Sequence, residues 1–187
     1  MSHQNLKFKT LFENVSIIPV LVIENIEQAL PLANTLLSQG YRVLEVTLRT
    51  DCALEAVKKI ANELPQAIVG VGTVTSAAQF AQAQKAGAQF AISPGATPAL
   101  IAAAENIDMP YLPGIATASE AMALYAQGYR YLKLFPAEAS GGINLLKSLH
   151  GPLPDIKFCP TGGINAELAQ NYLQQPNVTC VGGSWMT

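Results

Sequence analysis

The segment Val43–Val71, which reads VLEVTLRTDCALEAVKKIANELPQAIVGV, shows the repeating unit of this chain most clearly. Its two ends, Val43–Thr47 and Ala67–Val71, are rich in β-branched residues, which is typical of strands. Between them, Cys52–Leu64 carries apolar residues three and four positions apart, which is typical of one face of a helix. A strand, a helix and a second strand in close succession predict two parallel strands joined by a right-handed crossover.

The same unit recurs along the whole chain, with a new strand after roughly every 23 residues. The other predicted strands are Ile17–Val22, Gln89–Ile92, Pro110–Pro113, Tyr131–Phe135, Ile156–Phe158 and Thr179–Val181. The other predicted helices are Ile26–Gln39, Ala77–Ala86, Pro98–Glu105, Ala118–Ala126 and Ala166–Leu173. The helix N-caps are expected at Thr50, Ser76, Thr97, Thr117 and Asn165.

Eight strands that alternate with helices favour an α/β fold of the (β/α)8 or TIM barrel type. The alternative is an open doubly wound sheet, in which five or six strands are more usual. Residues 2–14 are expected to form a helix before the first strand. Because Thr187 follows the last strand closely, we expect the barrel to lack its final C-terminal helix. Residues 1–187 are accordingly expected to form a single domain.

The composition excludes several classes of protein. Half of the residues are hydrophobic, 13% are charged and the net charge is −2, which excludes a disordered chain and leaves no basic surface for nucleic acid. Apolar runs such as Val15–Ile23 are shorter than the roughly 20 residues that cross a membrane, and the N-terminus lacks a secretory signal. With Cys52, Cys159 and Cys180 expected as free thiols, we expect a cytoplasmic protein without a membrane or nucleic-acid partner.

A lysine inside the barrel is the first candidate catalytic residue. The alternation of side chains along Tyr131–Phe135 turns Lys133 inwards and the two leucines of this strand towards the helices. A buried lysine is rare unless it is paired. Desolvation favours a neutral amine, which can attack a carbonyl group and form a Schiff base. A purely structural ion pair with an interior carboxylate is the alternative.

The same alternation places Glu45, Thr47 and Arg49 on the inner face of another strand. Glu45 is expected to lie opposite Lys133, where its carboxylate can act as a general acid and base. Arg49 is expected near the rim, where a guanidinium group can bind a carboxylate. A charge cluster of Glu45, Arg49 and Lys133 with no catalytic role is the alternative.

Glycine-rich segments follow three of the predicted strands. In the first, GVGT at residues 70–73, Thr73 offers a hydroxyl and an amide to an acid group. The segments Cys159–Asn165 and Val181–Trp185 each contain two adjacent glycines, and they follow the last two strands, where this fold often binds phosphate. The glycines could also be simple turn residues. His3 and His150 lack partners at metal-ligand spacing, so no metal site is expected.

Taken together, five motifs resemble the bacterial class I aldolases of the Entner–Doudoroff pathway. These are the 2-dehydro-3-deoxy-phosphogluconate (KDPG) aldolases, which often also act on 4-hydroxy-2-oxoglutarate (KHG). The motifs are EVTLRT at 45–50, GVGTV at 70–74, ISPG at 92–95, KLFPAE at 133–138 and FCPTGGI at 158–164. They occur in the family's order, and the resemblance extends from about Pro19 to Trp185.

The resemblance implies a role for each matching residue. Lys133 would form the Schiff base and Glu45 would be the general acid and base. Arg49 and Thr73 would hold the pyruvate carboxylate, while Pro94 and Phe135 would line the pyruvate pocket. The distal groups and the phosphate would contact Thr161, Gly162, Gly163, Gly183 and Ser184. The resemblance also implies a homotrimer, no metal or organic cofactor, and a phosphorylated 2-keto-3-deoxy sugar acid as substrate.

Two other functions stay open at this point. One is a phosphosugar isomerase or epimerase on the same barrel, with Glu45 as the base and Lys133 as an electrostatic partner. The other is a non-catalytic metabolite-binding barrel that its charge cluster helps to hold together. An imine with pyruvate would separate the aldolase from both, because neither alternative needs a covalent intermediate.

Overall fold

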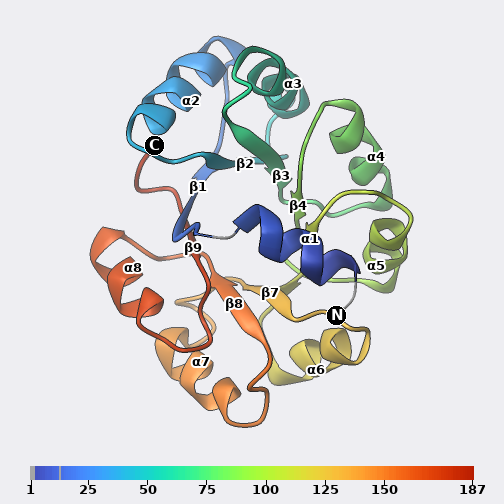
Figure 1. Ribbon diagram of the computed structural model, residues 1–187, viewed down its shortest axis with the longest axis vertical. Helices are drawn as coiled ribbons and strands as arrows, with labels where there is room; N and C mark the ends of the chain where they lie inside the picture. Colours follow the sequence, from blue (N-terminus) through green and yellow to red (C-terminus); the bar gives the residue numbers. More distant parts are fainter. Residues whose placement is uncertain (1–2, 13) are drawn as a thin grey trace.

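The computed structural model describes residues 3–12 and 14–187, without the side chains of residues 3–5 and 7. Strands and helices alternate along it (Figure 1). The strands are β1 (Ile17–Leu21), β2 (Val43–Thr47), β3 (Ile68–Gly72), β4 (Ala91–Ile92), β5 (Tyr111–Leu112), β6 (Gly114–Ile115), β7 (Tyr131–Leu134), β8 (Lys157–Pro160) and β9 (Val181–Gly183). The helices are α1 (His3–Phe12), the 3-10 helix η1 (Ile26–Gln28), α2 (Ala29–Ser38), α3 (Ala53–Glu63), α4 (Ala77–Lys85), α5 (Pro98–Glu105), α6 (Ala118–Ala126), α7 (Gly142–His150) and α8 (Ala166–Leu173).

All strand pairs are parallel, as the alternation of strands and helices predicts. A six-stranded sheet has the order β5-β4-β3-β2-β1-β9, and a three-stranded sheet has the order β6-β7-β8. Two isolated parallel bridges, Phe158 with Val178 and Thr161 with Gly182, connect the β8 and β9 segments. The prediction of an α/β fold with parallel strands is therefore confirmed.

The predicted strand Pro110–Pro113 is wrong in its extent, because Pro113 separates β5 from β6. Proline has no N–H group to donate to a neighbouring strand, so it interrupts the ladder. Its carbonyl oxygen still accepts a hydrogen bond of 2.9 Å from the backbone N–H of Lys133. As a result β5 pairs with β4, and β6 pairs with β7.

The helix starts agree with the predicted caps at four positions and differ at the fifth. Thr97, Thr117 and Asn165 each accept a backbone hydrogen bond at the start of a helix, and Ser76 forms a capping box. Thr50 is not an N-cap, since α3 begins after Cys52. Its hydroxyl instead donates to the carbonyl of Ile23 over 2.6 Å, which ties the end of β2 to the end of β1.

Two buried clusters form the core, one between the helices and the strands and one on the inner side of the strands, against α1. The outer cluster contains the leucines of β7, Leu44 and Val46 of β2, and Val69 and Val71 of β3. The inner cluster includes Phe8 and Phe12 of α1, which stack on one another with ring centroids 4.1 Å apart. Phe8 also contacts Tyr131, and Phe12 contacts Phe90, so α1 lies across the N-terminal ends of the strands (Figure 1). The C-terminal ends lie on the opposite side.

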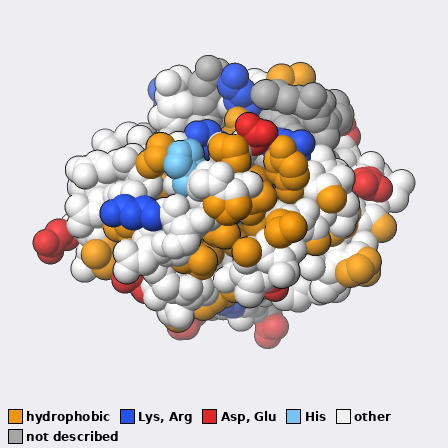
Figure 2. Space-filling model, turned by 90° about the horizontal axis from the view of Figure 1, so that it is seen from below, with side chains coloured by type: hydrophobic (Ala, Val, Ile, Leu, Met, Phe, Trp, Pro, Cys, Tyr) orange, Lys and Arg blue, Asp and Glu red, His pale blue; other side chains and the backbone are white. Residues whose placement is uncertain are grey.

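Two features of the surface complete the description. Figure 2 looks at the molecule from the edge where α6 and α7 lie in Figure 1, and it shows hydrophobic side chains gathered in one area. Met122 of α6 is 59% exposed, which is unusual for a large apolar side chain. In residues 3–12 and 14–187, no helix is long and apolar enough to cross a membrane.

Candidate active site

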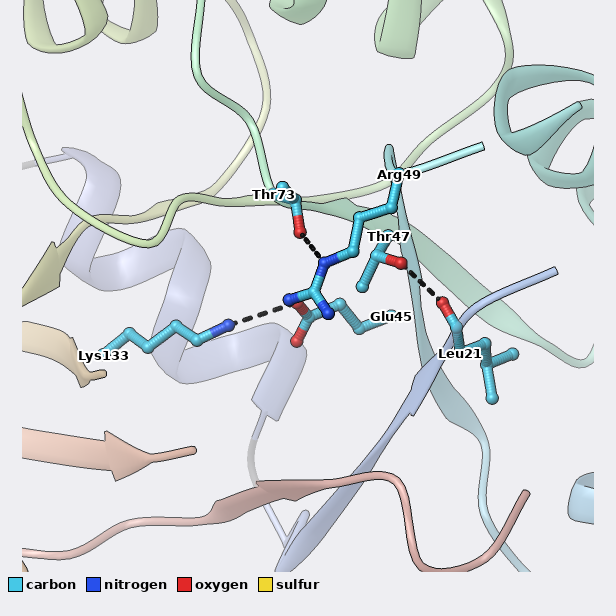
Figure 3. Close-up of polar contacts among 6 residues, drawn as sticks. All are labelled: Leu21, Glu45, Thr47, Arg49, Thr73 and Lys133. Atoms are coloured by element: carbon cyan, nitrogen blue, oxygen red, sulfur yellow. Dashed lines mark hydrogen bonds and ion pairs between the residues drawn. The ribbon is translucent and has the colours of Figure 1, made fainter. Parts of the chain in front are cut away.

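Lys133 and Glu45 come from different sheets and meet in the interior of the molecule. Lys133 lies on β7 and is 4% exposed, while Glu45 lies on β2 and is 1% exposed. The Nζ atom of Lys133 donates to Oε1 of Glu45 over 3.2 Å (Figure 3). The predicted inward direction of both side chains is thus confirmed. A buried amine beside a buried carboxylate can exchange a proton without help from solvent.

Gly72 provides the space that the Glu45 carboxylate occupies. A Cβ atom at Gly72, which ends β3, would lie 2.0 Å from Oε1 of Glu45. Any larger residue would therefore push the carboxylate away from Lys133. This close approach explains the second glycine of the GVGT segment, which turn chemistry alone would also have allowed.

Arg49 and Thr73 lie next to the ion pair, just beyond the ends of β2 and β3. Nε of Arg49 donates to Oγ1 of Thr73 over 3.0 Å. Figure 3 shows the guanidinium group turned towards Glu45 and Lys133. Thr73 has a φ of +59°, a left-handed conformation that is strained for a β-branched residue and that occurs mostly at functional sites. The guanidinium of Arg49, the hydroxyl of Thr73 and the amine of Lys133 can together bind a carboxylate.

A cavity of about 140 Å³ opens beside this cluster at the C-terminal ends of the strands. It brings together seven of the predicted site residues: Arg49, Phe135, Thr161, Gly162, Gly163, Gly183 and Ser184. Three further lining residues, Val20, Val22 and Ile164, escaped the sequence analysis. Two of them continue the apolar run of β1, so no polar group marked them as candidates.

Lys133, Glu45, Thr73 and Pro94 do not line this cavity, and the lining residues differ in their contacts. The ring centroid of Phe135 is 5.3 Å from Nζ of Lys133, so this side chain borders both the lysine and the cavity. The hydroxyl of Thr161 is buried against Gly182 and has no hydrogen-bond partner in the described part of the chain. Pro94 follows β4 at the same end, yet it is not one of the residues that line the cavity. Its carbonyl lies against Gly114 instead.

Two thiols lie among the inner core residues near the ion pair. Cys159 is the neighbour of Lys133 in the β7–β8 register, and both Cys159 and Cys180 are buried. The hydrogen bond with Cys159, burial and the negative charge of Glu45 together raise the pKa of Cys180 well above its usual range. The thiol therefore stays protonated and uncharged. Among the described residues, no group of three or more His, Cys, Asp or Glu side chains is arranged to hold a metal ion.

Comparison with known protein families gives a match over most of the chain. The profile of the family described as KDPG and KHG aldolase matches residues 9–187. The 2-dehydro-3-deoxy-phosphogluconate aldolase of Pseudoalteromonas atlantica is 51% identical over 176 residues, which covers 94% of this chain and 82% of the relative. The KHG/KDPG aldolase of Escherichia coli is 49% identical over 170 residues, which covers 91% of this chain and 80% of the relative.

Solved structures of similar proteins share the fold. One is the KDPG aldolase from Legionella pneumophila, solved with pyruvate captured at low pH as a covalent carbinolamine intermediate. It has a TM-score of 0.92 at 46% identity, and the match covers 98% of this chain and 87% of the Legionella chain. The KDPG aldolase of Zymomonas mobilis, solved with 3-phosphoglycerate, has a TM-score of 0.91 at 46% identity, and the match covers 95% of this chain and 84% of the Zymomonas chain.

Proposed function

The chain belongs to the KDPG and KHG aldolase family, and on that premise we propose how its own residues carry out the reaction. It is a carbon–carbon lyase of the Schiff-base type that cleaves 2-dehydro-3-deoxy-6-phosphogluconate into pyruvate and glyceraldehyde 3-phosphate. The residues that form the imine, move protons and bind the two ends of the substrate are our assignment.

Lys133 is the proposed nucleophile. After its ammonium group has lost a proton, the neutral amine adds to the C2 ketone of the substrate and forms a carbinolamine. The Glu45 carboxylic acid then returns its proton to the carbinolamine hydroxyl, which leaves as water, so that a protonated imine forms and Glu45 is again a carboxylate. The contact of 3.2 Å between Lys133 and Glu45 supports this assignment, since the carboxylate is placed to accept the proton that the amine must lose.

Glu45 is the proposed general base for bond cleavage. It removes the proton of the C4 hydroxyl, the C3–C4 bond breaks, and glyceraldehyde 3-phosphate leaves. The electron pair of that bond passes to the protonated imine, which becomes an enamine. Protonation of the enamine at C3 by the Glu45 carboxylic acid and hydrolysis of the imine then release pyruvate and the free lysine.

The two ends of the substrate have separate binding groups in this proposal. Arg49 and Thr73 hold the carboxylate at C1, and Phe135 and Pro94 line the pocket around it. The phosphate and distal hydroxyl groups contact Thr161, Gly162, Gly163, Gly183 and Ser184. Most of these residues line the cavity beside the ion pair, which supports the assignment.

The single observation that carries the proposal is the buried ion pair of Lys133 and Glu45 beside this cavity. The direct test is intact-protein mass before and after treatment with pyruvate and borohydride, with peptide mapping of the adduct. We expect one reduced pyruvyl group, on Lys133. No adduct on a folded protein would favour an epimerase or a binding protein, in which Lys133 is only an ion-pair partner.

We propose KHG as a second, slower substrate. It presents the same keto acid to Lys133 and Arg49 but has no phosphate for the glycine-rich segments. Binding energy from a remote group raises the rate of the reacting group as well as the affinity, so the substrate without phosphate loses both. Kinetics with both substrates measure the difference.

The finer description of the fold is also a proposal. We infer that residues 1–187 form one domain and that the strands close into a (β/α)8 barrel, in which β5 and β6 are two parts of one strand. The hydrogen bond from Lys133 to Pro113 and the bridges between the β8 and β9 segments support a closed ring. In the described part of the chain, no helix follows β9.

We propose a homotrimer that works in the cytoplasm. The hydrophobic area of Figure 2 and the exposed Met122 support burial of one face by further copies of the chain. Cys52, Cys159 and Cys180 are all unpaired, which suits a reducing compartment. Light scattering on the purified chain tests the assembly, because a monomer at micromolar concentration would contradict it.

A further inference from the structure

The segment that follows β7 lies directly against the segment that follows β8. The backbone N–H of Ala137 donates to the carbonyl of Thr161 over 2.8 Å, and that of Glu138 donates to the carbonyl of Gly162 over 3.2 Å. Thr161 and Gly162 line the cavity, whereas Ala137 and Glu138 do not. The first segment therefore supports the second from behind.

The side chain of Glu138 packs against the backbone of this loop at Gly163. Gly163 has a φ of +78°, and a Cβ atom there would lie 2.8 Å from Cβ of Glu138, so the glutamate packs flat on the backbone of the loop. Oε1 of Glu138 accepts a short hydrogen bond from the hydroxyl of Tyr172. Tyr172 lies on α8 with its side chain fully buried in the outer cluster, and this packing determines its position.

The hydrogen bond with Tyr172 also fixes the position of the negatively charged carboxylate of Glu138. Glu138 is the carboxylate packed on the loop that is proposed to bind a phosphate, and like charges repel there. Burial and the neighbouring Glu138 carboxylate raise the pKa of Tyr172 above its usual range, so the phenol remains a neutral donor. Tyr172 thus holds the carboxylate at α8, and neither Tyr172 nor Glu138 lines the cavity.

We propose that Tyr172 and Glu138 are positioning residues for the phosphate-binding loop at Thr161–Gly163. Glu138 supports the backbone of the loop, and Tyr172 holds the carboxylate of Glu138 in that place. Neither residue touches the reacting carbons. This inference rests on the proposed function, because it assumes that the distal phosphate binds at this loop.

The test is steady-state kinetics of Tyr172→Phe, Glu138→Gln and Glu138→Ala with KDPG and with KHG, which has no phosphate. Tyr172→Phe releases the carboxylate, so the KM for KDPG should rise about three- to tenfold, as for the loss of one hydrogen bond. Its KM for KHG and its imine trapping with pyruvate and borohydride should change less than twofold. Glu138→Gln keeps an acceptor without the charge and should retain wild-type KM values, whereas Glu138→Ala should behave like Tyr172→Phe.

The matched control is Tyr125→Phe, which removes a tyrosine–carboxylate hydrogen bond of 3.0 Å to Asp155, at a place that does not line the cavity. It should leave both KM values unchanged. Equal effects of Tyr172→Phe on KDPG and KHG, or no effect on either, would overturn the inference. If Tyr172→Phe does not fold, the comparison of Glu138→Ala with Glu138→Gln gives the same answer. A wild-type chain that cleaves neither substrate would contradict the proposed function instead.

Discussion

The amine of Lys133 and the carboxylate of Glu45 lie 3.2 Å apart, although 88 residues separate them in the sequence. Both are almost fully buried, and they form an ion pair. A structural ion pair and a catalytic pair share this geometry. They differ in what happens when one partner loses its charge but keeps its shape.

We expect Glu45→Gln to slow KDPG cleavage by about 10² to 10⁴, the usual contribution of general acid and base catalysis. The variant should still form an imine with pyruvate, because Lys133 remains. Lys133→Ala is the companion variant and should lose both cleavage and imine trapping. Unchanged turnover in Glu45→Gln would remove the carboxylate from the mechanism.

Gly72→Ala tests whether the space beside Glu45 matters. The new methyl group would lie 2.0 Å from Oε1, so the carboxylate must move and turnover should fall at least about tenfold in a folded protein. Gly151→Ala is the control, because a Cβ atom there meets nothing within 4 Å and the backbone is in the right-handed helical region. It should be neutral or stabilising by about 0.4–1 kcal/mol. Equal activity of the two variants would mean that Glu45 tolerates displacement.

Thr73→Val removes the acceptor of the Arg49 hydrogen bond while keeping the shape of the side chain. The pyruvate concentration for half-maximal imine trapping should rise about three- to tenfold, which corresponds to one hydrogen bond. Thr73→Ser retains the hydroxyl and should stay within twofold of the wild type. A large effect of both variants would point to the strained backbone rather than to the hydroxyl.

Thiol labelling should separate Cys52 from the other two cysteines. Cys52 is partly exposed, whereas Cys159 and Cys180 are buried. The raised pKa of Cys180 also keeps it from the reactive thiolate form. Ellman's reagent at pH 8 should react with one thiol in the native protein and with three after denaturation. Cys52→Ser should remove the native reaction, and rapid labelling of all three native thiols would contradict the buried placement.

Stability at acid pH should depend on the capping box of α6. The carboxylate of Glu120 accepts hydrogen bonds from Ala116 and Thr117, and the Ala116 N–H is the main cause of its lowered pKa. A lowered pKa in the folded state stabilises the protein above the unfolded value of about 4.3, and this contribution is lost as the pH falls through the folded value. Glu120→Ala should therefore cost roughly 0.5 kcal/mol at pH 7, allowing for solvent screening, and less below pH 4.

The control for this prediction is Gln79→Ala, which removes a neutral capping box. Oε1 of Gln79 accepts hydrogen bonds from the backbone N–H groups of Thr75 and Ser76 at the start of α4. Because an amide does not titrate in this range, its loss should cost the same free energy of unfolding at pH 7 and at pH 4. Equal pH dependence of the two variants would contradict the role assigned to the Glu120 charge. Urea denaturation at both pH values provides the measurement.

Much of this structure follows from periodicity and from the side-chain alternation of single strands. The inward direction of Lys133 and Glu45 depends only on the period of two, and the limits of α5, α6 and α8 agree with their apolar spacing. The strand broken at Pro113 was not predicted, because the missing N–H acts through a pairing with β7 that the local sequence does not reveal. For the same reason Val20 and Val22 were overlooked, since their place in the cavity depends on how distant strands come together.

The contact between Glu138 and Tyr172 could not be predicted from the sequence for the same reason. Glu138 lies in a recognised motif, yet its sequence fits equally well a loop residue at the surface. Tyr172 is one of several aromatic residues on helix faces, and only the packing of α8 brings its hydroxyl to the loop. Pairs of this kind are long-range products of the fold, and a single sequence contains no signal for them.

The position of α1 across the N-terminal ends of the strands has a kinetic consequence. Phe8 and Phe12 pack into that end, and the cavity beside the ion pair lies at the opposite, C-terminal ends of the strands. In the proposed binding mode, the half of the substrate bound to Lys133 lies deeper than the half that carries phosphate. Product release is therefore expected to be ordered, with the aldehyde departing first and pyruvate second. In the synthetic direction we expect pyruvate to bind first and the aldehyde to bind second.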